Sequence, residues 1–151
     1  MPEHVSIFSD THLGRSRWGL PSADMLRPLW QGSTHVVVNG DVAELHHPRY
    51  RRSAEREVLR LQELCEADGV SLTLLSGNHD PYVSEIRHLS LANGRVFVTH
   101  GDAIHPAIAP WSPTAAVMRE ARRSALAALE PETHGHLESV LRATQHGAAA
   151  E

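Results

Sequence analysis

The sequence contains no lysine and only one cysteine. All fourteen basic residues are arginines, a bias that is compatible with codon usage as well as with phosphate recognition and by itself favours neither. Cys65 has no partner for an intrachain disulfide, which excludes a disulfide framework and is compatible with a reducing compartment. No apolar run approaches the length of a membrane span. We therefore expect a cytoplasmic protein without a transmembrane segment.

An excess of positive charge is also missing. The formal net charge is −4 at pH 7 and the isoelectric point is near 6.3, which argues against nucleic-acid binding driven by overall charge. We expect no nucleic acid as a stable partner. The chain also has neither a Gly-x-Ser-x-Gly elbow nor a Walker-type Gly-Lys-Ser/Thr loop. The main sequence motifs of serine hydrolases and of P-loop proteins are therefore absent.

Short apolar runs alternate with a helix-forming segment over the first hundred residues. The chain has 151 residues, enough for one domain whose core buries about two-thirds of the unfolded surface. The alternation predicts an α/β fold. The predicted strands are 5–9, 35–38, 72–75, 87–91 and 95–98, the last two forming a hairpin around Asn93-Gly94. The predicted helices are 21–30, with a kink or early stop at Pro28, 53–68, 115–129 and 131–144.

Polar side chains follow four of the predicted strands. In open α/β sheets, ligands bind outside the carboxyl ends of the strands, so these side chains can converge although they are distant in sequence. The set offers oxygen and nitrogen donors without a thiolate, which suits a divalent cation such as Mn²⁺, Fe²⁺ or Zn²⁺. Its members are Asp10, His12, Asp41, Asn78, His79 and His100.

Such a set predicts hydrolysis of a phosphoester. Two ions about 3.5–4 Å apart would clamp a phosphate and lower the pKa of a bridging water, which gives hydroxide at neutral pH. His79 is predicted to act on the substrate, because a protonated imidazole beside the ions can donate to the leaving oxygen. Asp80 is predicted to orient His79.

Four motifs, each after a predicted strand, resemble the calcineurin-like metallophosphoesterases. They are Asp10-Thr11-His12, Gly40-Asp41, Gly77-Asn78-His79-Asp80 and Thr99-His100-Gly101, in the order of that family. The resemblance implies that Asp10 and His12 hold one ion, that Asp41 bridges, and that Asn78 and His100 hold the second ion. It also implies a β-sandwich flanked by helices and two divalent ions, Mn²⁺ first, with Fe²⁺, Zn²⁺ or Mg²⁺ as alternatives. His79 would act on the phosphate of a small-molecule or lipid-linked phosphoester.

The segments Gly40-Asp41-Val42-Ala43-Glu44 and His100-Gly101-Asp102 are similar to the UDP-2,3-diacylglucosamine pyrophosphohydrolase branch of that family. The last motif of the family, Gly-His-x-His, is not found. Gly135-His136-Leu137-Glu138 carries Glu in place of the second histidine and has no apolar strand before it.

The resemblance therefore ends near residue 102. We expect residues 1–102 to be the N-terminal part of a metallophosphoesterase core and 103–151 to be a helical extension or a truncated insertion, with each ion one ligand short. Two alternatives stay open. The chain is either a catalytically incomplete metal- or phosphate-binding module, or a fragment that needs a partner chain or self-association to complete its sheet.

Several other residues have two interpretations. His46 and His47 follow Glu44 closely and are interpreted as exposed loop histidines, with contact to a site near Asp41 as the alternative. His105 is a candidate ligand or substrate contact. Trp18, with Arg15 and Arg17, either lines a substrate mouth or packs on the surface. The arginines at 49, 51, 52, 56 and 60 are interpreted as a solvated helix face and entry loop, with contact to an anionic ligand as the alternative.

Overall fold

The computed structural model describes residues 4–15, 17–102, 114–130 and 139. The chain divides into two compact units, Met1–Ile104 and His105–Glu151. The first unit holds the strands and all of the polar motifs, and it is a mixed α/β structure. The second contains α2 (Ala115–Ala127), which lies within the predicted helix 115–129. The predicted helix 131–144 and His105 lie outside the described residues.

Three parallel strands form the main sheet of the first unit. They are β1 (Val5–Phe8), β2 (His35–Asn39) and β3 (Ser71–Leu75), in the order β1-β2-β3. Val5 pairs with His35, which in turn pairs with Ser71. The β-branched run at 36–38 is completely buried in the central strand, as expected for a parallel strand covered on both faces. The three carboxyl ends therefore lie at one edge.

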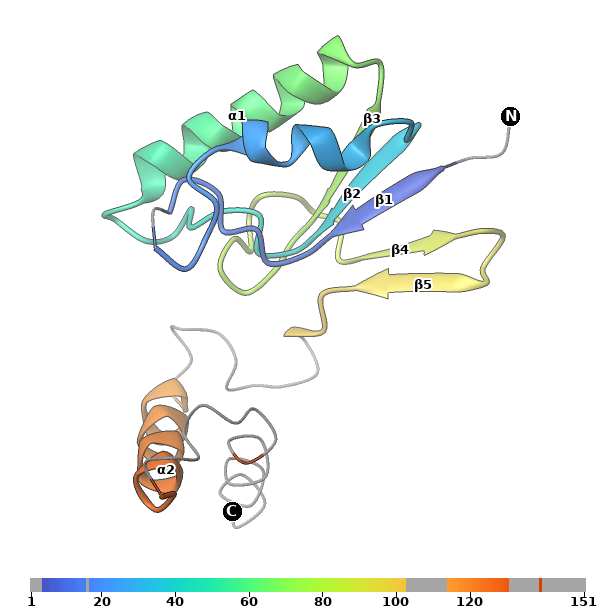
Figure 1. The fold of residues 1–151 in the computed structure, drawn as a ribbon. Coiled ribbons are helices and arrows are strands. Elements are labelled where there is room, and N and C mark those ends of the chain that lie inside the picture. The colour runs from blue at the N-terminus through green and yellow to red at the C-terminus, as the bar shows by residue number, and fades with distance from the viewer. Residues whose placement is uncertain (1–3, 16, 103–113, 131–138, 140–151) are drawn as a thin grey trace. The chain divides into compact units, whose positions relative to one another are not determined.

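Helical segments cover one face of this sheet (Figure 1). The long helix α1 (Arg51–Ala67) presents buried side chains including Ala54, Leu61 and Leu64 to it. The segment 21–30, predicted as a short helix with a kink or early stop at Pro28, is divided into two short 3₁₀ helices, η1 (Ala23–Met25) and η2 (Arg27–Trp30). Pro28 explains this division, because it has no N–H to donate to residue 24 and its ring would clash with that carbonyl.

An antiparallel hairpin packs on the other face of the sheet. It consists of β4 (His88–Leu91) and β5 (Val96–Thr99), and the predicted turn is confirmed, with Asn93 and Gly94 both at positive φ. Val98 packs with Val37 and Leu75 in a second, smaller core. The hairpin thereby brings the end of β5 to the sheet edge where β1, β2 and β3 end. In the described part of the chain, no helix has both the length and the apolar composition to cross a bilayer.

Candidate metal centre

The loops that follow β1 and β2 stay paired beyond the strands. The N–H of His12 donates to the carbonyl of Asp41 at 2.9 Å, and that of Leu13 donates to Val42 at 2.7 Å. Leu13 and Ala43 form a further parallel bridge. Because this pairing extends past the sheet, the polar residues of the first loop are held against those of the second.

Three residues of these loops have left-handed backbone conformations. The φ angles are 55° at Asp10, 42° at His12 and 51° at Asp41. This region costs an L-residue about 1–2 kcal/mol and is concentrated at functional sites. Gly40 allows another close approach, since a Cβ there would lie 2.4 Å from Cγ of His100. The backbone is thus shaped to bring these side chains together.

Asp80 fastens the turn after β3 to the loop after β2. Its carboxylate is completely buried and accepts hydrogen bonds from the N–H groups of Asp41, Ala43 and Gly77, at 3.1, 3.1 and 2.9 Å. Burial raises the pKa of Asp80, and the charge of Asp41 adds to this shift against the opposing backbone donors. The prediction that Asp80 orients the His79 ring is wrong. Both of its oxygens hold backbone groups, and a different carboxylate contacts the ring.

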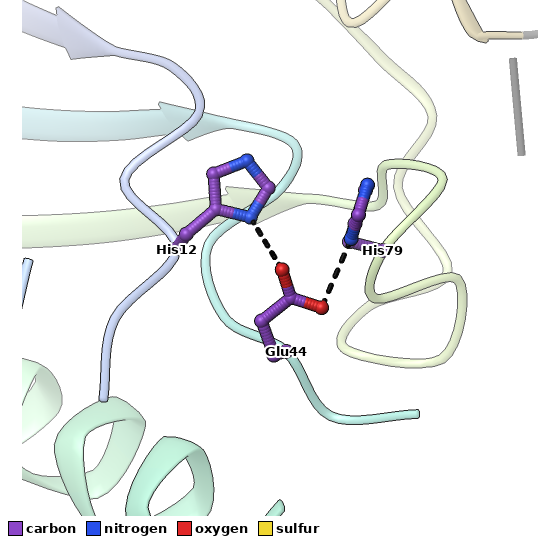
Figure 2. Close-up of side chains that lie close together, drawn as sticks. All are labelled: His12, Glu44 and His79. Carbon is purple, nitrogen blue, oxygen red and sulfur yellow. Dashed lines mark hydrogen bonds and ion pairs between the residues drawn. The ribbon is translucent and has the colours of Figure 1, made fainter. Parts of the chain in front are cut away.

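That carboxylate is Glu44, which lies between two histidine rings (Figure 2). Its Oε2 is 3.0 Å from Nδ1 of His79, and its Oε1 is 3.2 Å from Nδ1 of His12. The two rings meet edge to face with centroids 4.8 Å apart. The guanidinium of Arg15 donates to the same Oε1. We call His12, Glu44 and His79 the first group; they offer ligand atoms that all lie within 4.8 Å of one another.

Glu44 is only 2% exposed, yet it is surrounded by donors. Burial alone would raise its pKa, but the close contact of the His12 ring, the hydrogen bond from His79 and the charges of His79 and Arg15 hold the pKa of Glu44 well below its usual range. Glu44 is therefore an anion at neutral pH. The sequence contains a weak signal for Glu44, which is the single carboxylate in the apolar stretch Val42–Leu45, three residues after Asp41.

Asp10, Asp41 and His100 form the second group, and their ligand atoms also lie within 4.8 Å of one another. Nδ1 of His100 donates to the carbonyl of Asn39 at 2.8 Å, which directs Nε2 into the site. This nitrogen lies 3.4 Å from Oδ1 of Asp41 and 3.0 Å from Oδ1 of Asn78. A histidine held through its other ring nitrogen is the usual arrangement of a metal ligand.

Asp41 extends between the two groups. Its Oδ2 is 3.8 Å from Nε2 of His12 and 4.0 Å from Nε2 of His79, whereas its Oδ1 faces His100. Asp41 is only 3% exposed. The grouping differs from the predicted ligand sets, and it includes Glu44 and His79, which were not predicted as ligands. Among the described residues, Asp10 groups with Asp41 and His100, and His12 groups with Glu44 and His79, so the two residues predicted to share an ion lie in different groups.

The donor set fits divalent cations that accept mixed nitrogen and oxygen ligands. It provides three imidazoles, three carboxylates and the Asn78 amide, and such sets suit Mn²⁺, Fe²⁺ or Zn²⁺. Nδ1 of His12 is buried without a hydrogen bond in the described part of the chain, and its contact with Glu44 has only the geometry of an ion pair. A cation would satisfy such a nitrogen and would neutralise the adjoining carboxylates.

Metal affinity is expected to rise with pH. The contact between the His100 ring and Asp41 raises the pKa of His100 from the ordinary 6.5 to about 9, although burial of the ring acts in the opposite direction. A ligating nitrogen must be neutral, so protons compete with the metal at His100 below that pKa. The affinity for the metal should therefore increase by about tenfold per pH unit from about pH 6.5 to about pH 8.5. Calorimetric titration of the metal-free chain with Mn²⁺ measures this slope.

The variant His100→Gln serves as the comparison, because it carries no titrating ring and should bind Mn²⁺ more weakly with a flatter pH profile. An affinity that does not change with pH in the unmodified chain would contradict the assignment of His100 as a ligand.

The remaining predicted residues divide between the site and the surface. His47 is exposed as predicted, but the same interpretation is wrong for His46, which is half-buried with its Nδ1 2.5 Å from the His79 carbonyl oxygen. Arg15 reaches the site through Glu44. Trp18 is 77% exposed and lies against the guanidinium of Arg17.

No protein-family model, no curated protein and no solved structure matches this chain. Its chemistry is therefore inferred from its own residues. Two adjoining groups of histidines and carboxylates, with one buried carboxylate between them, can bind a pair of cations and present an imidazole beside them.

Proposed function

We propose that this chain is a metal-dependent phosphoesterase that hydrolyses a phosphomonoester or a phosphodiester at a binuclear centre. The observation that supports this most directly is the position of Asp41, whose two oxygens face different groups of potential ligands. The ordered strand-end motifs point to the calcineurin-like metallophosphoesterases, and on this proposal the sheet and hairpin form the N-terminal part of that sandwich. The proposal places the chain in the cytoplasm, where its single cysteine, the buried Cys65, is compatible with a reducing environment.

Two divalent cations, when bound, would acidify a water molecule and neutralise charge on the phosphate oxygens. The protein side chains would hold the ions, donate a proton and position the proton donor. Asp10, His12, Asp41, Asn78 and His100 would hold the ions. His79 would donate a proton from Nε2 to the leaving oxygen, because its Nδ1 is already held by Glu44. On this proposal Glu44 is a positioning residue.

The protonation of His79 agrees with that role. Burial disfavours the imidazolium, but the hydrogen bond to Glu44 and the negative charges of Asp41 and Glu44 outweigh burial and raise the pKa of His79 above 6.5. A larger fraction of the ring is then protonated at neutral pH, as a general acid requires.

Metal content and turnover together test the proposal. The purified chain is loaded with Mn²⁺, the bound metal is counted, and hydrolysis of p-nitrophenyl phosphate and of bis-p-nitrophenyl phosphate is followed. About two ions per chain with turnover is the expected result. One weakly bound ion without turnover would instead support a metal- or phosphate-binding module. Activity that appears only as the protein concentration rises would support a fragment completed by self-association.

Replacement of Glu44 tests how His79 is positioned. Glu44→Gln removes the charge that holds both rings while keeping the shape of the side chain. We expect the pKa of His79 to fall and turnover to decrease by about 10–100-fold, the usual effect of removing a group that orients a functional histidine. The pKa is measured by NMR titration of the metal-free chain.

Glu57→Gln is the matched control, since Glu57 is also buried but accepts from the N–H of Ala23, away from both groups. It should leave the His79 pKa and turnover unchanged. An unchanged His79 pKa in Glu44→Gln would show that the contact between Glu44 and His79 has no role in catalysis.

A further inference from the structure

A continuous series of side-chain contacts borders His79 and Glu44. The guanidinium of Arg15 lies 5.7 Å from the centre of the Tyr50 ring, and that of Arg49 lies 5.5 Å from it. The Tyr50 ring is 4.8 Å from His47, which is 6.4 Å from His46, and His46 is 5.5 Å from His79. We call these five residues the basic rim: Arg15, His46, His47, Arg49 and Tyr50.

The basic rim carries positive charge that is only partly neutralised. Glu44 pairs with Arg15, but the same carboxylate also contacts His12 and His79, so it neutralises the charge of Arg15 only in part. The nearby Glu55 pairs with Arg51. Among the described residues, no acidic side chain forms an ion pair with Arg49, which is exposed. The exposed guanidinium of Arg49 therefore remains available to an incoming anion.

Tyr50 gives the two guanidinium groups a fixed support. A cation over an aromatic ring is attracted by the ring quadrupole, and a guanidinium held in place loses less freedom when it binds a carboxylate or a phosphate. The position of Tyr50 is itself fixed, because it precedes the first residue of α1 and its carbonyl accepts from the N–H of Ala54. The rim is thus attached to the main helix of the first unit.

The location of the basic rim suggests what it binds, and this step rests on the proposed function. If His79 protonates the leaving oxygen, the leaving group lies beside His79, where Arg15 and His46 border the first group. We propose that the basic rim binds an anionic group on the leaving group, so that the preferred substrates are phosphoesters whose leaving group carries a second negative charge, a carboxylate or a phosphate.

Three aryl phosphonates test this proposal without requiring turnover. They carry in the para position a neutral carbamoyl group, a carboxylate or a second phosphonate, and their affinities for the Mn²⁺-loaded chain are measured by calorimetry. We expect the carboxylate to bind about three- to tenfold more tightly than the carbamoyl compound, as one charge-assisted contact near the surface implies. Tighter binding of the bisphosphonate would identify a phosphate as the preferred second group.

Two arginine variants locate the effect. Arg49→Gln should abolish the preference for the charged compounds while the carbamoyl compound binds as before, because in the described part of the chain Arg49 contacts Tyr50 and His47 and neither group of ligands. Arg95→Gln makes the same change of charge at an exposed arginine on the β4–β5 turn, where Nε donates to the Ala92 carbonyl, and should keep the preference.

The outcomes separate this inference from the proposed function. Turnover of p-nitrophenyl phosphate together with equal affinities for the three phosphonates would overturn the inference and leave the function standing. A charge preference that disappears in Arg49→Gln, in a chain without turnover, would support the basic rim and count against the enzyme. A preference that survives Arg49→Gln, or the absence of phosphonate binding, would also overturn the inference.

Discussion

Asp41→Asn should remove both metal ions and reduce phosphoester turnover by at least about 10²–10³-fold, the range seen when a single electrostatic stabiliser is lost from an active site. The carboxylate lies between the two groups, so that its replacement by a neutral amide weakens both at once. Asparagine has nearly the same shape and can still accept the backbone hydrogen bond from His79. Metal content by elemental analysis and turnover of p-nitrophenyl phosphate are the two measurements.

Asp24→Asn makes the same chemical change at an exposed aspartate that pairs with Arg60, and it should leave both measurements unchanged. The variant at position 41 should also lower the pKa of His100 toward its ordinary value, because Asp41 is the main cause of that shift. Retention of full metal content in Asp41→Asn would show that Asp41 does not bridge.

His79→Gln should leave the metal content intact and reduce turnover by about 10²–10⁴-fold, the usual contribution of a positioned general acid. The ring is held at Nδ1 by Glu44 while its Nε2 lies 4.0 Å from Oδ2 of Asp41, so glutamine removes the proton donor and keeps a polar side chain. Activity should be compared at saturating Mn²⁺, so that a small loss of affinity does not appear as a loss of chemistry.

A different result would assign His79 differently. His79 belongs to the first group of potential ligands, and a parallel loss of metal and turnover would make it a ligand in place of an acid. His88→Gln is the control, since His88 lies on β4 with its ring stacked on Phe97; this variant should behave as the unmodified chain.

Much of the sheet could be predicted, because its determinants are local. The β-branched run at Val36–Val38 predicted a buried strand, and Asn93-Gly94 predicted the hairpin turn. The meeting of the strand ends followed from the general geometry of parallel sheets. Between residues 21 and 30 the start signal Pro21-Ser22 and a kink or early stop at Pro28 were predicted, but the 3₁₀ geometry of the two short helices was not.

The residues of the candidate site could be proposed from the sequence, but most of the contacts between them could not. Asp10, His12, Asp41, Asn78 and His100 were each recognisable as polar residues after a strand. Glu44 and Asp80 owe their positions to pairing between segments far apart in sequence. Glu44 is placed by the bridge that extends from Leu13 to Ala43, and Asp80 by backbone donors on two loops. No short sequence pattern indicates the residues, distant in the chain, that Glu44 and Asp80 contact.

The left-handed backbone at Asp10, His12 and Asp41 has a consequence for how this protein can be altered. Each of these residues occupies a conformation that a glycine would adopt more easily. Their charged or ring side chains lie close together, an arrangement that does not favour folding stability. The fold therefore carries internal strain where its chemistry is concentrated. Selection for heat resistance alone would favour glycine at these three positions, and it would yield a more stable chain without three of its candidate ligands.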